Sequence, residues 1–180
     1  MQVVQAPDTI LSDKAARVEK VDKTILDLIE AMKVTLVTAS DPEGVGIAAP
    51  QVGRSLQIFL IKPEKEAPIS VFINPEVQLL GTPVQSKSRK NSGAMLEGCL
   101  SLKDIWGTVQ RYPKVHVTYL DEFGKTHKKV FASWPARIIQ HEYDHLQGIL
   151  FPLRVLEQKG RLYKSHKGSE GKDEFEPMEI

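Results

Sequence analysis

Two histidines separated by four positions are the clearest chemical signal in the sequence. In His141-Glu142-Tyr143-Asp144-His145 the two imidazoles stand at i and i+4. On a helix they would differ by about 40° in azimuth and by about 6 Å along the axis, so both could bind one metal ion. Glu142 lies between them, where a carboxylate could act as general base on a water molecule. The spacing therefore predicts metal-assisted hydrolysis, and the alternative is a surface helix that has this spacing by chance.

A third metal ligand must come from elsewhere in the chain, because catalytic metal sites usually have three protein ligands and one open position. Beyond His145 the only histidine is His166, in a polar segment, and Glu157 is the nearest carboxylate flanked by apolar residues. The single cysteine, Cys99, lies in the largely apolar segment Leu96–Leu102. A buried lone cysteine is more often an inert small apolar residue than a ligand. The incomplete histidine pair favours the ligand interpretation here.

A segment rich in small residues, Gly44–Gly53, is the third candidate. Gly44 and Gly46 would let a backbone or a ligand approach closely, and the Gln51 amide could donate a hydrogen bond to a developing oxyanion. The segment lacks the spacing of a dinucleotide-binding fingerprint and the lysine of a phosphate-binding loop, so phosphate binding is disfavoured. On these residues alone, a tight turn that leads into a strand explains the segment equally well.

Taken in order, these three segments resemble the peptide deformylase family. The family is marked by Gly-x-Gly-x-Ala-Ala-x-Gln, Glu-Gly-Cys-x-Ser and His-Glu-x-x-His, which match Gly44–Gln51, Glu97–Ser101 and His141–His145. The similarity covers residues 6–155. Outside the motifs it continues at Pro7-Asp8, Phe72–Pro75 and Ala136–Gln140.

The resemblance implies an enzyme that removes the formyl group, as formate, from the initiator N-formylmethionine of nascent polypeptides. It implies one divalent metal ion per chain, held by Cys99, His141 and His145. In the family this ion is physiologically Fe²⁺, and Zn²⁺, Ni²⁺ or Co²⁺ can occupy the same site. A thiolate and two imidazoles suit all of these metals, so the ligand chemistry alone does not select iron.

The resemblance also implies which residues act on the substrate. Glu142 would take a proton from water as general base and deliver one to the departing amine as general acid. The Gln51 side chain and the Leu100 backbone N–H would donate hydrogen bonds to the oxyanion. The run Lys103–Trp106 departs from the common family form, which concerns the substrate pocket rather than the chemistry. Substrate-binding residues are predicted within the motifs and beside the histidine pair: Gly44, Val45, Gly46, Glu97, Trp134 and Ile138.

Two other functions stay open on the residues alone. A zinc metalloprotease could use the same helix, but it needs a further His or Glu ligand downstream, and the segment around Cys99 would then have no role. A structural metal-binding domain without catalysis is the other alternative. The presence of Glu142 and the evidence for only three ligands oppose it, because structural sites are normally closed by four.

Periodicity predicts the elements that position these residues. Apolar residues recur with helical spacing between residues 22 and 37, with Asp22 as N-cap, and this pattern is typical of an amphipathic helix. Alternating or short apolar runs bounded by Pro and Gly predict strands, the last two of which form a hairpin. These strands are expected at Gln57–Ile61, Val71–Ile73, Val77–Leu80, Val115–Tyr119 and Thr126–Phe131.

The helix that carries the histidine pair is expected to be buried. Ser133 is its predicted N-cap, Pro135 stands in the first turn, and Gly148 ends the helix. Apolar residues are spread around most of its circumference, so its ionisable side chains need partners. Together the elements predict an α+β fold of mostly antiparallel strands packed around this central helix, with the amphipathic helix near the N-terminus.

A chain of 180 residues has the size of one domain with a substantial core. Lys+Arg 24 and Asp+Glu 23 give a net charge of +1, which argues against a broad basic surface and against sequence-specific nucleic-acid binding. Residues 84–93 are polar and basic and are predicted to form an exposed loop. A single catalytic domain is expected over residues 1–166, followed by a polar C-terminal tail at 167–180, of which residues 167–173 resemble a linker or a frayed terminus.

The sequence also predicts where the protein works and with what. It has no run of about 18 apolar residues, so no membrane-spanning helix is expected. The first twenty residues lack the features of a secretory or transit peptide, and a single cysteine cannot form an intrachain disulfide, which together predict a cytoplasmic protein. The expected partners are N-formylmethionyl peptides, nascent chains and, transiently, the ribosome, and the chain is expected to be a monomer.

Overall fold

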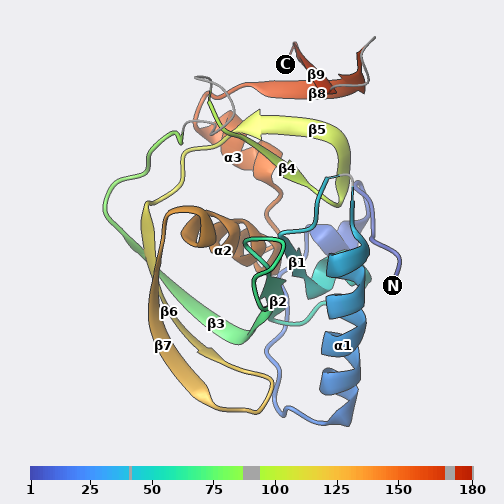
Figure 1. Cartoon of the computed structure of the whole chain (residues 1–180), viewed down its shortest axis with the longest axis vertical. Helices are drawn as coiled ribbons and strands as arrows, with labels where there is room; N and C mark the ends of the chain where they lie inside the picture. Colours follow the sequence, from blue (N-terminus) through green and yellow to red (C-terminus); the bar gives the residue numbers. More distant parts are fainter. Residues whose placement is uncertain (41, 87–93, 169–172, 180) are drawn as a thin grey trace.

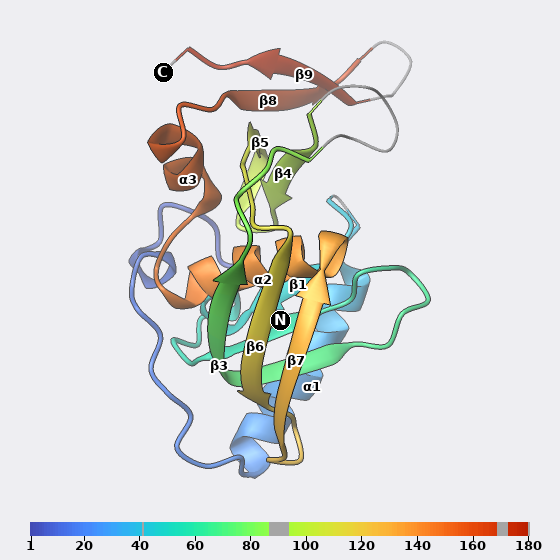
Figure 2. The same cartoon turned by 90° about the vertical axis from the view of Figure 1, so that its left-hand side faces the viewer.

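Two antiparallel sheets lie on either side of a central helix, α2 (Ser133–Leu146), as Figures 1 and 2 show. The computed structural model describes every residue except 41, 87–93, 169–172 and 180. In one sheet the strand order is β1-β2-β3-β6-β7, and in the other it is β4-β5-β8-β9. The strands are β1 (Gly46–Ala48), β2 (Ile58–Ile61), β3 (Ser70–Leu80), β4 (Leu96–Cys99), β5 (Leu102–Thr108), β6 (Lys114–Leu120), β7 (Thr126–Ala132), β8 (Leu162–Lys167) and β9 (Asp173–Pro177).

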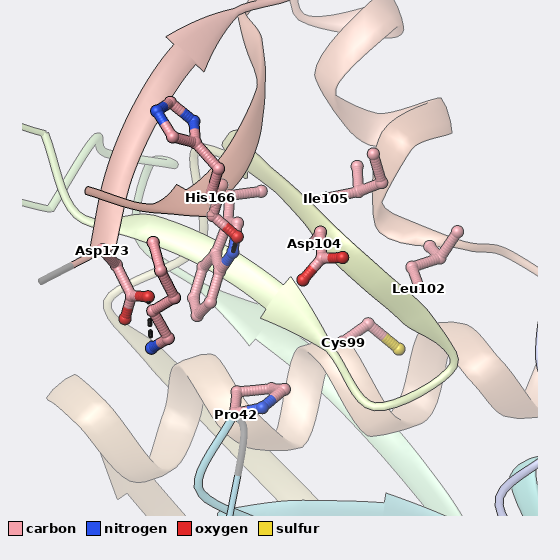
Figure 3. A pocket seen from close by; sticks show the side chains of 10 residues that line it. Pro42, Cys99, Leu102, Asp104, Ile105, His166 and Asp173 are labelled. Atoms are coloured by element: carbon pink, nitrogen blue, oxygen red, sulfur yellow. Dashed lines mark hydrogen bonds and ion pairs between the residues drawn. The ribbon is translucent and has the colours of Figure 1, made fainter. Parts of the chain in front are cut away.

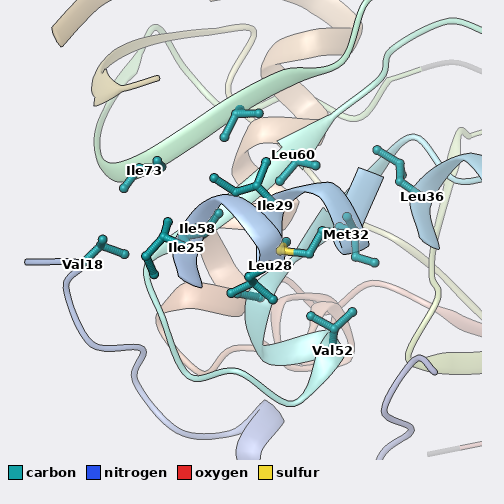
Figure 4. Close-up of a cluster of buried hydrophobic side chains, with 13 residues drawn as sticks. Val18, Ile25, Leu28, Ile29, Met32, Leu36, Val52, Ile58, Leu60 and Ile73 are labelled. Carbon is teal, nitrogen blue, oxygen red and sulfur yellow. The ribbon is translucent and has the colours of Figure 1, made fainter. Parts of the chain in front are cut away.

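The predicted α+β class with antiparallel strands is confirmed, and so is the amphipathic helix. That helix is α1 (Lys23–Thr38), and the Asp22 carboxylate caps it by accepting from the Ile25 N–H at 3.1 Å. Its buried face packs on β1 and β2 in the apolar cluster of Figure 4, where Ile29 and Met32 have no exposed surface. The remaining helices are η1 (Thr9–Leu11), η2 (Ala49–Val52) and α3 (Phe151–Glu157). Among the residues with described structure, none forms a helix long and apolar enough to cross a membrane.

Strand β3 corrects one prediction, because the expected strands Val71–Ile73 and Val77–Leu80 are a single strand. The pairing with β6 shifts register between Ile73 and Glu76, so a bulge accommodates Pro75, which has no N–H to offer the ladder. Next to it, the Asn74 side chain exchanges two hydrogen bonds of 2.8 Å with the backbone of Val18. The proline therefore interrupts the pattern of the sequence but not the strand.

The start of α2 corrects a second prediction. Ser133 is not the N-cap but the first helical residue, with a positive φ of 56°, and Ala132 in the capping position makes no side-chain cap hydrogen bond. The reason is that β7 leads directly into the helix and the Ser133 N–H is bonded to the Pro113 carbonyl at 2.9 Å. The end of the helix is as predicted, since Gly148 follows it with a φ of 71°.

Lys167 and Asp173, at the two ends of the segment predicted to be a linker or a frayed terminus, are paired strand residues instead. Strand β8 continues to Lys167, across the expected domain end at residue 166, and β9 pairs with it antiparallel from Lys167↔Asp173 to Tyr163↔Pro177. Because β8 also pairs with β5, residues 173–177 extend a sheet instead of fraying. In the predicted loop at 84–93, Val84 forms an isolated bridge with Arg111, and positions 87–93 lie outside the described residues.

Candidate active site

Helix α2 presents His141 and His145 one turn apart, with ring centroids 5.0 Å from each other. Glu142 is 3% exposed and His145 is 1% exposed. This burial arises because the sheet that contains β1 and β2 covers one side of α2 and the sheet that contains β4 covers the other (Figure 2). Glu142, Asp144 and His145 are buried on this helix, so each of them needs a partner or a function.

Strand β4 brings Cys99 to the histidine pair. Its Sγ lies 3.3 Å from Nε2 of His145, and one ligand atom from each of Cys99, His141 and His145 falls within 4.8 Å of the others. A metal ion lies about 2.0–2.3 Å from imidazole nitrogen and thiolate sulfur, so donors gathered this closely could share one ion. The structure thus brings together the three side chains that the sequence singles out, and they form a group that could hold a metal ion.

The carboxylate of Glu97 orients the imidazole ring of His141. Its Oε1 is 2.8 Å from Nδ1 of His141, which leaves the other ring nitrogen for the cluster. Burial alone would raise the pKa of Glu97, but Arg111 at 2.6 Å and the hydrogen bond from His141 outweigh it and hold that pKa well below its usual range. Glu97 is therefore ionised, and it fixes the tautomer of the imidazole beside it.

The side chain of Gln51 is held in one orientation. Its Oε1 accepts from the Ala48 N–H at 2.8 Å, so Nε2 must face the cluster, where it lies 3.5 Å from Sγ of Cys99 and 3.2 Å from Oγ of Ser101. Helix η2, which carries Gln51, follows directly after β1, and this tight connection points the amide inward. The result is a fixed N–H donor beside the possible metal ligands.

The carboxyl group of Glu142 has an oxygen that is free to act on a proton. Within the described part of the chain its Oε2 makes no hydrogen bond, and burial raises the pKa of Glu142 to about 7. The approach of β1 to this side chain requires glycine, because a Cβ on Gly46 would lie 2.7 Å from Cδ and 2.9 Å from Cγ of Glu142. A carboxyl group that gains and loses a proton near neutral pH is suited to general acid–base catalysis.

Comparison with known proteins shows to which family the sequence belongs. The family described as polypeptide deformylase matches residues 1–161. The chain belongs to the polypeptide deformylase family. A peptide deformylase of Pseudothermotoga lettingae is 40% identical over 144 residues, which make up 80% of this chain and 76% of that protein. The family resemblance of the three motifs is therefore confirmed.

Solved structures of the family agree in fold. A peptide deformylase of Synechococcus elongatus, in complex with actinonin, superposes with a TM-score of 0.74 at 35% identity and covers 84% of this chain and 78% of its own. The peptide deformylase of Thermotoga maritima gives a TM-score of 0.73 at 30% identity, over 84% of this chain and 95% of its own. Both likenesses show that this chain shares the overall fold of these peptide deformylases.

A cavity of about 940 Å³ opens onto the group of possible metal ligands. Cys99, His141, Glu142 and Gln51 border it, whereas His145 lies behind them. Gly44 does not line it; a Cβ there would instead meet Cβ of Ala39 at the end of α1, at 3.0 Å. The other residues predicted to act on the substrate all line it: Leu100, Val45, Gly46, Glu97, Trp134 and Ile138.

Sequence reasoning missed the arginines that hold α2 in place. Arg111 binds Glu97 through one nitrogen and Asp144 on α2 through another, each at 2.6 Å. Arg154 on α3 binds the other oxygen of Asp144 at 2.7 Å. The sequence does indicate that Asp144 needs a cation, because this residue lies on a helix predicted to be buried. Nothing in the spacing of the sequence indicates which arginine supplies that cation.

The ligand set of the protease alternative does not assemble. Glu157, the downstream carboxylate that it would need, lies on α3, where its side chain is 50% exposed and pairs with Arg154 at 3.1 Å. Within the described residues, the group of possible metal ligands is that of Cys99, His141 and His145. The family match points in the same direction, so the deformylase interpretation is the one that the geometry favours.

Proposed function

We propose that this chain hydrolyses the N-formyl group of N-formylmethionyl peptides and nascent chains, releasing formate and a free α-amine. One observation carries the proposal: a buried carboxyl group with an oxygen that makes no hydrogen bond among the described residues, a fixed amide donor and two of the three clustered soft or imidazole ligands line one cavity. These are the parts that hydrolysis of an unactivated amide needs, namely a proton carrier, an oxyanion donor and a site for a Lewis acid.

Cys99, His141 and His145 would hold one divalent metal ion, with Fe²⁺ as the physiological ion and Zn²⁺, Ni²⁺ or Co²⁺ as substitutes. The donor set supports this, because a thiolate and two imidazoles suit these metals. Burial, with His141 and Arg111 nearby, lowers the pKa of His145 well below its usual value, which favours the neutral imidazole that binds metals. When bound, the ion supplies Lewis acidity, which eases the ionisation of water near neutral pH.

Glu142 would move the protons of the reaction. As a carboxylate it accepts one proton from the attacking water at its free oxygen, and as a carboxylic acid it donates one to the departing amine nitrogen. Its pKa of about 7 makes both forms available at neutral pH. On the side of β1 the carboxyl group borders backbone instead of a competing base, since Gly46 lies directly against the side chain.

The oxyanion that forms at the formyl carbon needs donors in fixed positions. Nε2 of Gln51 is one, because its Oε1 is anchored by the Ala48 N–H and the amide cannot turn over without losing that bond. We assign the backbone N–H of Leu100, which follows Cys99 and borders the cavity, as the second. Each such donor contributes about 3–4 kcal/mol to a tetrahedral transition state.

The peptide would bind between two strand edges. Strand β1 is at the edge of one sheet and β4 is at the edge of the other, and both border the cavity. A peptide in extended conformation could add its backbone hydrogen bonds to such an edge, while Trp134 and Ile138 contact its side chains. Val45 and Gly46 would keep the reacting end narrow enough for a formyl group. Gly44 would act only indirectly, through its contact with α1.

The proposal also covers the oligomeric state, the location and the partners of the protein. We infer a monomeric cytoplasmic enzyme that contacts the ribosome transiently and shows no sequence-specific binding of nucleic acid. The net charge of +1 supports the last of these points, because a near-neutral chain offers no broad basic surface to nucleic acid. The catalytic unit would not stop at residue 166 but include β9, since β8 and β9 complete the sheet that carries Cys99.

Release of formate from a formyl-Met-Ala-Ser peptide by Glu142→Ala tests the proposal. Metal content should stay at the level of the unaltered chain, because the three ligands remain, whereas formate release should fall about 10³-fold. Glu157→Ala is the matched control, since it removes an exposed carboxylate outside the cavity and should retain full activity. Near-normal turnover by Glu142→Ala, or equal cleavage of an acetylated peptide by the unaltered chain, would contradict the proposal.

A further inference from the structure

The β8–β9 strand pair is the part of the molecule that the family match leaves out, since that match ends at residue 161. Even so, Asp173 and Phe175 of β9 line the cavity of about 940 Å³ together with the catalytic groups. We propose that this strand pair is an outer wall of the substrate cavity and that Phe175 selects peptides with a large apolar side chain after the formylmethionine. This inference rests on the deformylation proposed above.

The strand pair is connected to the catalytic cluster through one sheet. Strand β8 pairs with β5, with Trp106 opposite Tyr163 and Gly107 opposite Leu162, and β5 pairs in turn with β4, which ends at Cys99. Figures 1 and 2 both show β8 and β9 beyond β5, at the end of the molecule remote from the β6–β7 turn. The position of β9 is thus set by the strands that position the thiol.

Aromatic contacts continue this connection to the cavity. The ring of Phe175 meets Trp106 edge to face, with centroids 5.6 Å apart and an interplanar angle of 87°, and the Trp106 Nε1–H donates to Oγ of Ser165 at 3.1 Å. Trp106 in turn packs onto Gly98, where a Cβ would lie within 2.7–3.0 Å of three ring atoms. Phe175 therefore rests against Trp106, while 40% of its surface is exposed and it borders an open cavity.

The charges of this wall favour an apolar occupant over a basic one. Asp173 is the acidic group that β9 adds to the cavity, and its carboxylate is paired with Lys167 of β8 at 2.6 Å. Figure 3 shows this ion pair beside a second, smaller cavity of about 40 Å³ that shares Cys99, Trp106 and Asp173 with the large one. Asp173 is thus already engaged by Lys167, and the apolar surface that β9 offers to a peptide is the ring of Phe175 beside Trp106.

Phe175 has no polar side-chain atom and its ring meets that of Trp106, so it can act on the affinity for the peptide but not on the proton transfers. Contact with an apolar side chain would remove on the order of 50 Å² of apolar surface from water, which corresponds to about a five- to tenfold change in affinity. The effect should depend on the side chain that follows the methionine. A merely structural role would instead change all peptides alike.

The test compares Phe175→Ala with the unaltered chain on formyl-Met-Ala-X and formyl-Met-X-Ser peptides, where X is Leu, Phe, Ser or Lys. We expect KM to rise about five- to tenfold for the Leu and Phe peptides of at least one series, less than twofold for the Ser peptides, and kcat to stay constant. Phe175→Leu should restore most of the selectivity. Phe123→Ala, at an 86% exposed position in the β6–β7 turn, is the matched control and should change neither.

Each remaining result decides against one proposal. Equal KM changes for Ser and Leu peptides, or none for any, would overturn the role of Phe175 while leaving deformylation intact. A loss confined to the Lys peptides would overturn apolar selection and assign the wall to Asp173. Absence of formate release by the unaltered chain from all the peptides would overturn the proposed function itself, which the Ser peptide of the first series tests independently of Phe175.

Discussion

Helix α2 and strand β9 both border the same cavity, but they are held in opposite ways. On α2 the acidic and imidazole groups are buried and most are paired, as Glu97 with His141 and Asp144 with Arg111 show. Strand β9 is exposed along its whole length and is held by backbone pairing with β8, by exposed ion pairs with that strand and by the contact of Phe175 with Trp106. The reacting groups therefore lie in a buried region that packing and nearby ion pairs hold together, whereas the outer wall lies where side chains can change at little cost.

This difference has an energetic basis. A buried ion pair contributes little when intact, because the desolvation of both charges offsets their attraction, but loss of one partner leaves an uncompensated charge. An exposed strand carries no such penalty, since water can replace any lost contact. The catalytic side should thus respond strongly to single substitutions, and the β9 side should respond weakly in stability while changing selectivity.

The largest effect is expected from Arg111→Met. The substitution leaves the buried carboxylates of Glu97 and Asp144 without their shared cation, so the free energy of unfolding should fall by about 3–5 kcal/mol in urea titrations. Arg154→Met, which removes a more exposed cation from the same Asp144, should cost about 1 kcal/mol or less. Equal losses for the two variants would show that burial does not distinguish these arginines.

Next in size is the contrast between Met32→Ala and Phe175→Ala. Met32 has no exposed surface in the cluster between α1 and the five-stranded sheet, so its truncation should cost about 2–5 kcal/mol. Phe175 is 40% exposed on β9, and its truncation should cost less than about 1 kcal/mol. Thermal unfolding of both variants measures the contrast, which would fail if Phe175→Ala were as unstable as Met32→Ala.

Gly46→Ala should damage catalysis more than folding. The new Cβ would displace the Glu142 side chain, and a shift of this size at a catalytic base can lower kcat/KM by about 100-fold. Metal content should be unchanged, because the residues that we propose as ligands are not touched. Val45→Ala at the adjacent position removes atoms instead of adding them and should reduce formate release far less. Full activity of Gly46→Ala would show that Glu142 does not require its present position.

The smallest effect concerns Lys33, which joins Glu30 on α1 to Glu122 at the β6–β7 turn. Burial alone would lower the pKa of Lys33, but the two carboxylates outweigh it and raise that pKa. The contribution of Lys33 to the free energy of unfolding is therefore complete below the pKa of an unfolded lysine, about 10.4, and is lost as the pH rises through the higher pKa of the folded state. Lys33→Met should cost about 0.5–1 kcal/mol at pH 7 in urea titrations, and less in high salt.

A matched control for this pair is Lys23→Met, because Lys23 and Asp27 form a more exposed ion pair on the same helix. Its loss should change the free energy of unfolding by no more than about 0.5 kcal/mol. A larger effect for Lys23 than for Lys33 would contradict the view that Lys33 connects two elements.

Local patterns were enough to predict much of the fold. The hydrophobic period predicted α1 with its Asp22 cap, and alternation predicted the β6–β7 hairpin, because both depend on neighbours in sequence. Pro75 led to two predicted strands where there is one, since a bulge that accommodates proline is formed only by pairing with another strand. The polar composition of residues 167–180 concealed β9 for the same reason, because its pairing depends on β8.

For the site, the sequence determined which groups could do chemistry, and the tertiary structure decided how they are held. The spacing of His141 and His145 is a property of one helix, so the sequence alone is enough to recognise it. The choice of Arg111 as partner of Glu97 and Asp144, and the addition of Phe175 to the cavity, unite segments far apart in the chain. Such contacts result from sheet pairing and from the burial of charge, which depend on the whole fold and leave no local period in the sequence.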